Sequence, residues 1–150
     1  MHVEGTLVFE AGRQATWDVV TDPQVVLGCA PQVAGMQVRV VDETRVEVAG
    51  RVGPRFLSFP AFATVEVADR QAPDSLSIVV RGQAAGNTLE ATASVTLADG
   101  EVAGTTTVAW TADGSVTGSF AAMAEPRLER DAPAAIARVA ECLKARVQSR

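Results

Sequence analysis

The sequence predicts a single α+β domain, residues 1–150, in which a curved, seven-stranded antiparallel sheet packs against a long C-terminal helix. Alternating apolar and polar residues, which are typical of half-buried strands, recur in seven segments. Helical spacing follows the first of these segments and returns near the C-terminus. The connections between the strands are too short for parallel crossovers, so the sheet is expected to be antiparallel.

The N-terminal part predicts one strand and two short helices. Residues 3–9 alternate between apolar and polar side chains, and residues 13–21 carry apolar residues, among them Trp17, at helical spacing. A second helix is expected over residues 23–30, because Pro is tolerated at a first helical position. Asp22, directly before it, is expected to be the N-cap. Trp17 is expected to anchor the first helix against the sheet.

The middle of the chain predicts a meander of six strands. They are expected at residues 36–40, 45–51, 56–68, 76–82, 89–97 and 104–112. Turns are expected near Asp42-Glu43 and at Gly53-Pro54, and Asp99-Gly100 is a hairpin dipeptide. Asp113-Gly114 is expected to close the last strand. Pro60 falls inside the third of these strands and predicts a bulge or a local loss of pairing.

The last segment, residues 121–150, predicts the helix that covers the sheet. Its apolar side chains lie on one stripe: Leu128, Ala132, Ala135, Ile136, Val139, Leu143 and Val147. Pro133 interrupts this pattern, so the regular helix either starts near Asp131-Ala132 or kinks at the proline. A transient contact of this amphipathic helix with a membrane surface is a second, lesser interpretation.

Charge and composition exclude several functions. The chain has 18 acidic and 13 basic side chains, a net charge of -5, which argues against binding to nucleic acid. Its one imidazole, His2, lies at the N-terminus, where a catalytic triad or general base is not expected. His2, Cys29 and Cys142 lack the short spacings of zinc ligands. We expect no metal and no other cofactor.

The apolar side chains are mostly small, and two interpretations follow. A core of Ala and Val leaves space for a ligand, or the composition is a bias without structural meaning. No apolar run approaches the length of a membrane span, and the N-terminus lacks the features of a signal peptide. These observations predict a cytoplasmic location.

Several single residues carry alternative interpretations. Cys29 is either a reactive thiol near a pocket or a small buried apolar residue. A Cys29–Cys142 disulfide is not expected in a reducing cytosol. Trp110 either packs in the core or lines a cavity. The expected inner face of the sheet carries no charged residue. The candidates for acid–base catalysis are therefore Asp22 and Glu66, each of which would have to be turned into the pocket by the backbone.

Three motifs carry a resemblance to a known family. They are Trp17-x-x-x-x-Asp22-Pro23-x-Val25-x-x-x-Cys29-x-Pro31, Val52-Gly53-Pro54, and Gly118-x-Phe120-Ala121-x-Met123-Ala124-x-x-Arg127-Leu128. Together with the order of elements, they resemble the family of G-subunit proteins associated with carbon monoxide dehydrogenase. This family lies within the START and polyketide-cyclase (SRPBCC) superfamily of helix-grip folds. The resemblance extends over essentially the whole chain.

The resemblance implies a protein that holds a hydrophobic small molecule, a lipid or a quinone-like carrier, in a cavity between the sheet and the last helix. It also implies an accessory role to a molybdenum hydroxylase complex of the carbon monoxide dehydrogenase type, without catalysis by the domain itself. The alternatives are a cyclase- or aromatase-like enzyme and an assembly or recruitment module. The oligomeric state is left open. The expected ligand-binding residues are Val25, Cys29, Val48, Phe59, Ile78, Ala93, Trp110, Phe120, Met123, Leu128 and Ile136.

Overall fold

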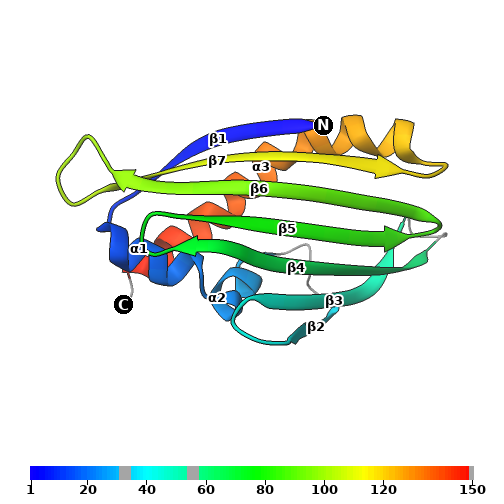
Figure 1. The fold of residues 1–150 in the computed structure, drawn as a ribbon, viewed down its shortest axis with the longest axis horizontal. Coiled ribbons are helices and arrows are strands. Elements are labelled where there is room, and N and C mark those ends of the chain that lie inside the picture. The colour runs from blue at the N-terminus through cyan, green and yellow to red at the C-terminus, as the bar shows by residue number, and fades with distance from the viewer. Residues whose placement is uncertain (31–34, 54–57, 149–150) are drawn as a thin grey trace.

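The computed structural model describes residues 1–30, 35–53 and 58–148, and it confirms the predicted architecture. All neighbouring strands of the curved sheet are antiparallel, in the order β1-β7-β6-β5-β4-β3-β2 (Figure 1). The elements are β1 (His2–Phe9), α1 (Arg13–Val20), α2 (Pro23–Gly28), β2 (Gln37–Val40), β3 (Arg45–Val52), β4 (Phe59–Gln71), β5 (Ser75–Ala84), β6 (Asn87–Asp99), β7 (Thr106–Thr117) and α3 (Ala121–Gln148).

The helix α3 crosses one face of the sheet diagonally (Figure 1). Its packing on the sheet is concentrated on β1 and β7, and its C-terminal part also contacts α1 and α2. Beyond β7 the chain turns back, and the N-terminal end of α3 lies near the start of β1 (Figure 1). This placement leaves the inner face of β3, β4 and β5 away from the packing of α3, and α1 and α2 face it across a pocket.

The core lies where α1, α3 and the sheet meet. Its buried members are Phe9, Trp17, Val19, Cys29, Leu76, Leu97, Val108, Leu143 and Val147. Two buried hydroxyls fix the turn between β1 and α1: Thr106 Oγ1 donates to the carbonyl of Ala11 at 2.7 Å, and Thr16 Oγ1 donates to the same oxygen at 3.5 Å. Because buried hydroxyls need a partner, these two bonds hold α1 against the last strand.

Gly5 allows a close approach between β1 and Trp110 of β7. The two residues are paired across the strands, and a Cβ on Gly5 would lie 2.8 Å from Trp110 Cζ2 and 3.0 Å from Nε1. Trp110 is only 8% exposed, so its ring has little room to move. We expect Gly5→Ala to lower the free energy of unfolding by about 1–3 kcal/mol through overpacking. Urea unfolding of both proteins measures this change.

Gly28→Ala is the matched control. A Cβ on Gly28 would meet only ordinary contact, with Arg146 Nη2 at 3.6 Å. Gly28 is also the last residue of α2, and Ala is favoured over Gly within helices. The control is therefore expected to be neutral or slightly stabilising. Equal losses in both variants would contradict the role of Trp110.

Of three predicted breaks in the sheet, two are wrong and one is right in part. Pro60 makes no bulge and pairs with Arg51 of β3, but it lies one residue beyond the last β4–β5 pair, so the local loss of pairing is present on that side, where a missing N–H disturbs little. The irregularity in β4 lies instead between Ala68 and Gln71. The Asp99-Gly100 dipeptide does not make a two-residue hairpin, because a longer connection over residues 100–105 joins β6 to β7.

Asp113-Gly114 does not end a strand, because β7 continues through it to Thr117. Gly114 pairs with Ala91, and its N–H donates to the carbonyl of Met1 at 3.0 Å. A Cβ on Gly114 would lie 2.8 Å from the Glu90 carbonyl oxygen, so this glycine permits close strand packing and forms no turn. Pro31, at which the second helix is predicted to end, Pro54 of the predicted turn and residues 56–57 of the strand predicted at 56–68 fall outside the described residues.

The helix α3 runs without a break from Ala121 to Gln148, so the predicted start near Asp131-Ala132 is wrong. It contains two prolines, Pro126 and Pro133. Its buried side chains, Ala140, Leu143 and Val147, all lie in the C-terminal half. The stabilising contacts of the helix are thus unevenly distributed along its length.

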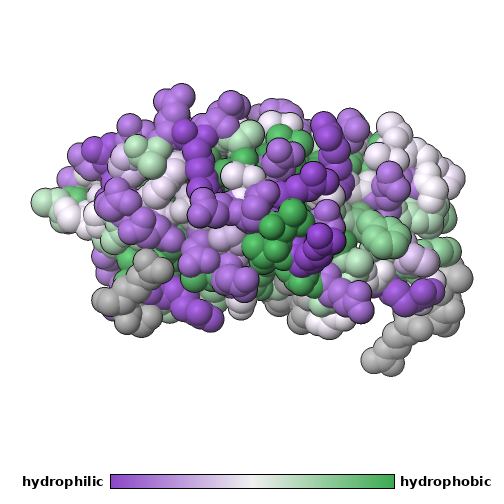
Figure 2. All heavy atoms as spheres, turned by 60° about the horizontal axis from the view of Figure 1, so that its bottom comes forward, coloured by the Kyte–Doolittle hydropathy of each residue, from purple (hydrophilic) through white to green (hydrophobic). Residues whose placement is uncertain are grey.

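The short strand β2 forms an exposed edge of the sheet. Figure 2, turned to bring this side forward, shows an apolar patch surrounded by hydrophilic side chains. The exposed apolar residues of β2 and the turn after it are Val38, Val40 and Val41. Because β2 is only four residues long, this edge offers little surface for pairing with another strand.

Candidate functional site

An apolar pocket of about 270 Å³ lies between α1 and α2 on one side and β3, β4 and β5 on the other. Its lining residues come from both helices, from the three strands and from the turn before β3. They are Val20, Thr21, Pro23, Val26, Leu27, Ala30, Glu43, Thr44, Val46, Val48, Val65, Val67, Leu76 and Ile78. Of these, three are polar: Thr21, Glu43 and Thr44.

Strand alternation builds the sheet side of the pocket. Residues two apart on a strand share a face, so each strand contributes a pair of apolar side chains. Across the strands, Val46 pairs with Val65 and Val67 pairs with Ile78. The sequence encodes this wall directly, because its strands carry apolar residues at every second position.

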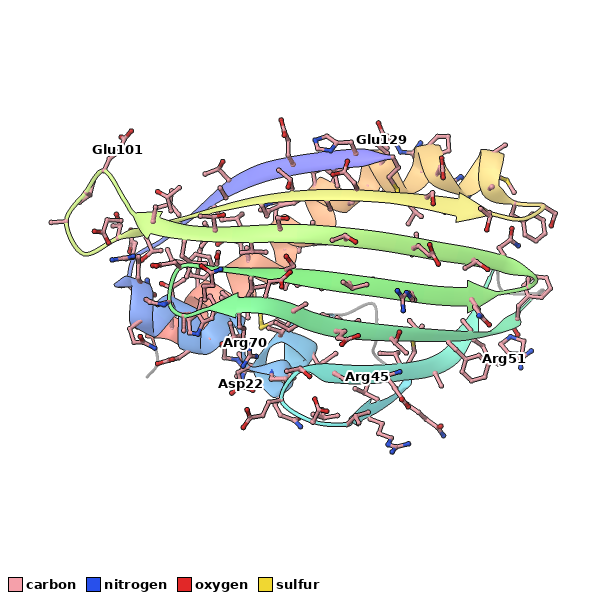
Figure 3. The ribbon with its side chains drawn as sticks, viewed as in Figure 1. Asp22, Arg45, Arg51, Arg70, Glu101 and Glu129 are labelled. Carbon is pink, nitrogen blue, oxygen red and sulfur yellow. A yellow bond between two sulfur atoms is a disulfide. The ribbon has the colours of Figure 1, made fainter. Side chains whose placement is uncertain are left out.

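Two short helices build the other side, and a capping carboxylate fixes their junction. Asp22 lies in extended conformation before α2 and accepts hydrogen bonds from the N–H groups of Gln24, at 3.0 Å, and Val25, at 3.5 Å. Asp22 is therefore the predicted N-cap (Figure 3). The cap directs Pro23, Val26 and other residues of α2 toward the sheet.

We expect Asp22→Ala to lower the free energy of unfolding by about 0.5–2 kcal/mol, because two N–H groups at the start of α2 lose their acceptor. Asp22→Asn keeps an acceptor oxygen and serves as the control. Thermal or urea unfolding of the three proteins measures the difference. The capping role is contradicted if the Asn variant is as unstable as the Ala variant.

Polar groups gather where the α1–α2 junction faces the β2–β3 turn. Thr21 Oγ1 donates to the carbonyl of Trp17 at 2.6 Å, and Thr44 donates to Asp42 through both its N–H and its hydroxyl. These two bonds from Thr44 hold the pKa of the Asp42 carboxyl below its usual range. The Arg70 guanidinium donates to the carbonyl of Glu43 at 3.2 Å. The pocket thus has an apolar body and one polar side.

A disulfide joins Cys29, at the end of α2, to Cys142 on α3 (Figure 3). The Cα atoms are 5.5 Å apart, although 113 residues separate the two cysteines in the sequence. The expectation of unpaired cysteines is therefore wrong, and so is the interpretation of Cys29 as a reactive thiol. That expectation depended on a reducing compartment, which the residues themselves do not establish.

The structure brings some of the predicted ligand-binding residues together. Val48 and Ile78 line the pocket, while Val25 and Cys29 lie behind it, packed in the core. Phe59 and Ala93 lie half-buried on β4 and β6, and Ala93 is the cross-strand neighbour of Ile78.

Trp110 is buried, and its Nε1–H meets no acceptor among the residues that the structure describes. It therefore belongs to the packed part of the inner face, next to Gly5.

The remaining predicted residues lie on or before α3, away from the pocket. Leu128 and Ile136 line a second, open groove of about 580 Å³ along the middle of this helix, residues 127–139. Phe120 is 43% exposed and Met123 is 55% exposed. The apolar stripe of α3 therefore has a free N-terminal half and a packed C-terminal half.

Sequence reasoning chose Val25 and Cys29 from the α2 segment, but it missed the residues of α2 that line the pocket and the contribution of the β2–β3 turn. Val26, Leu27 and Ala30 line the pocket, but a helix of six residues is too short to show which face is buried. Glu43 and Thr44 lie at the predicted turn near Asp42-Glu43. The polar composition of that turn indicates exposure to solvent, and no signal in the sequence indicates its proximity to α1.

The titratable cluster at the start of β1 lies on the outer surface, away from this pocket. His2 Nδ1 is 2.6 Å from Asp113 Oδ1, and Nε2 is 3.3 Å from Glu4 Oε2. The hydrogen bond with Asp113, followed by that with Glu4, raises the pKa of His2 above its ordinary value of 6.5. The contribution of these two hydrogen bonds to the stability of the fold is therefore fully present below pH 6.5, and it is lost as the pH rises through the folded-state pKa of His2.

We expect an NMR titration to give a His2 pKa above 6.5, and a lower value in the Asp113→Asn variant. The effect on stability is small, because the group is exposed to solvent. An unchanged pKa in the variant would contradict the assignment to Asp113.

Within the described residues, no helix has both the length and the apolar character needed to cross a membrane.

Comparison with solved structures defines the class of the fold. A conserved protein from Geobacillus kaustophilus is similar, with a TM-score of 0.81, 17% identity and coverage of 99% of this chain and 96% of that one.

A START superfamily protein from Mycobacterium smegmatis has a TM-score of 0.67 and 14% identity, with 99% and 97% of the two chains covered. A norcoclaurine synthase from Thalictrum flavum has a TM-score of 0.65 and 13% identity, with 99% and 94% covered. The fold is thus the START-type helix-grip fold.

The model of the carbon monoxide dehydrogenase G-subunit (CoxG) family matches residues 5–148. The chain belongs to this family. No curated protein matches it.

Proposed function

We propose that this domain binds an apolar small molecule, a lipid or a quinone-like carrier, in the pocket between α1–α2 and β3–β5. The observation that carries the proposal is the lining of this pocket, in which apolar side chains of two helices and three strands surround a preformed space with one polar side. A concave, mostly apolar site with few polar groups is typical of small-molecule binding.

The ligand extends beyond the pocket. A volume of about 270 Å³ is slightly below the roughly 300–1,000 Å³ of typical ligand sites, so the pocket takes one part of a longer molecule. The inner face continues from Ile78 to its cross-strand neighbour Ala93 and from there to Ala112, the cross-strand neighbour of Ala93, and both of these side chains are small. There the free stripe of α3, with Leu128 and Ile136, covers the other part of the ligand.

Further members of the predicted set belong to this extended site. Phe59 and Val48 lie on the inner face of neighbouring strands, and Val25 and Cys29 support the helical wall from the core. Phe120 and Met123 lie at the outer end of the α3 stripe.

The domain acts as a carrier without turnover of its own. Glu43 supplies the carboxylate in the described lining, and it lies in the turn before β3, whereas Asp22 caps α2 and Glu66 is exposed. Without a positioned proton-transfer group, binding energy gives little help to a chemical step. Membership of the CoxG family supports an accessory role to a molybdenum hydroxylase of the carbon monoxide dehydrogenase type.

The disulfide and the sequence favour different cellular compartments for the protein. The sequence predicts the cytoplasm, whereas the Cys29–Cys142 bond favours an oxidising compartment or a protected thiol pair. Alkylation of free thiols in intact cells, followed by mass spectrometry of both cysteine peptides, measures which state is present.

Native mass spectrometry of freshly purified protein tests the binding proposal. We expect an added organic mass that is lost on mild activation and that extraction identifies as a lipid or quinone-like compound. Protein without any bound mass, which also fails to bind added apolar probes, would refute the proposal. Turnover of an added substrate that disappears in Asp22→Asn would make the domain an enzyme instead.

A further inference from the structure

The helix α2 is the least firmly held wall of the pocket. It has six residues, none of them buried, and one of its sides faces the pocket. Its packing with other elements is mainly with α1 and α3. Because a helix this short is not stable by itself, its position depends on tertiary attachments.

The disulfide supplies the attachment at the C-terminal end of α2. Cys29 is the C-cap residue, and its N–H donates to the carbonyls of Val25 and Val26. Its partner Cys142 directly precedes Leu143, one of the buried residues that fix α3 in the core. The covalent bond thus ties this short helix to the best-packed part of α3. The other end of α2 is held by the Asp22 cap and by the chain connection to α1.

We propose that the Cys29–Cys142 disulfide is a redox-controlled latch on the apolar pocket. In the oxidised protein it holds α2 in place as the outer wall, and its reduction by a dithiol releases α2 and speeds exchange of the bound molecule. This inference rests on the proposed binding function, because a latch has a role only where the pocket holds a ligand.

The exposure of the two cysteines sets the order of the reduction. Cys29 is 5% exposed, whereas Cys142 is partly exposed, so a thiolate of the dithiol attacks Cys142 Sγ. The Cys29–Cys142 bond breaks, a mixed disulfide forms at Cys142, and Cys29 leaves as a thiolate that takes up a proton. The second thiol of the reductant then displaces Cys142, which also becomes a thiol. Two electrons pass to the protein, and the dithiol becomes a disulfide.

Hydrogen exchange tests the latch without any ligand. The N–H of Val26 donates to the carbonyl of Asp22, and the N–H of residue 29 donates within α2, so both report on opening of this helix. We expect these two amides to exchange at least about tenfold faster in dithiothreitol-reduced protein than in oxidised protein, because α2 opens locally once the tether is lost. The C29A/C142A double variant should exchange like the reduced protein and should not respond to dithiothreitol.

Dissociation of the fluorescent apolar probe N-phenyl-1-naphthylamine tests the effect on the pocket. Stopped-flow release is expected to be about tenfold faster from reduced protein and from C29A/C142A than from oxidised protein, since the wall of the pocket opens more often. Val147→Ala is the control for lost stability, because Val147 is a buried core residue of α3 outside the pocket and its removal leaves the disulfide intact. This control should release the probe at the oxidised rate.

The outcomes separate the latch from the function on which it rests. Failure of the oxidised protein to bind the probe at all would refute the binding proposal. Normal binding with equal release rates in oxidised and reduced protein would refute the latch and leave the binding proposal standing. Faster release in Val147→Ala to the same extent would also refute the latch, because general loss of stability would then explain the effect.

Discussion

Replacing Val48 by Phe is expected to abolish binding of N-phenyl-1-naphthylamine while the domain remains folded. Val48 projects from β3 into the pocket, opposite the helical wall formed by α2. A phenyl ring at this position occupies the space that a ligand needs. Because the ring enters an existing cavity, the cost in overpacking is at most about 1–3 kcal/mol. Fluorescence titration measures the affinity, and urea unfolding measures the stability.

Ala49→Phe is the matched control for this variant. Ala49 is the next residue on β3 and faces the opposite side of the sheet, beside its cross-strand partner Phe62. It should bind the probe normally. Ala93→Phe, which adds a ring next to Ile78, should weaken binding by a longer ligand that extends toward α3. If Val48→Phe binds as well as the unchanged protein, the pocket is not the binding site.

Removal of the disulfide in C29A/C142A is expected to lower the free energy of unfolding by about 2–4 kcal/mol. The bond closes a loop of 113 residues, and this loop contains β2 to β7 and most of α3. In the chain-entropy model, a crosslink across so long a segment restricts the unfolded chain strongly. The substitution removes only the two sulfur atoms from the core, and the other core side chains are unchanged.

Urea unfolding in the presence and absence of dithiothreitol measures this contribution. The unchanged protein should lose stability on reduction, whereas the double variant should not respond to the reductant. The prediction is wrong if reduction does not change the urea midpoint of unfolding of the unchanged protein. It is also wrong if the reductant lowers the urea midpoint of the double variant.

Most of the fold could be predicted from the sequence because a period of two residues fixes both the strand and its buried face. Val46, Val65 and Ile78 share the inner face, as their alternation with polar neighbours predicts. The errors lie at chain reversals. Asp113-Gly114 has the composition of a turn, but close contact with Glu90 on the neighbouring strand explains the glycine equally well.

The site could be predicted only in part because it depends on the angle between α3 and the sheet. The spacing of Leu128 and Ile136 shows that they share a face of the helix, but not which strands that face meets. In the structure α3 packs mainly on β1 and β7, so these side chains line a groove apart from Val48 and Ile78. The pairing of Cys29 with Cys142 is a contact across 113 residues, which no local pattern encodes.

The two prolines of α3 have a consequence for the cooperativity of the fold. Neither has an N–H, so the carbonyls of Ala122 and Glu129, four residues earlier, lose their usual helical donors. The C-terminal half is anchored by Leu143, Val147 and the disulfide. We therefore expect residues 121–132 to be the less stable part of the helix, because they lack these anchors. If this half opens without global unfolding, it gives the proposed ligand a second route beside the one that α2 controls.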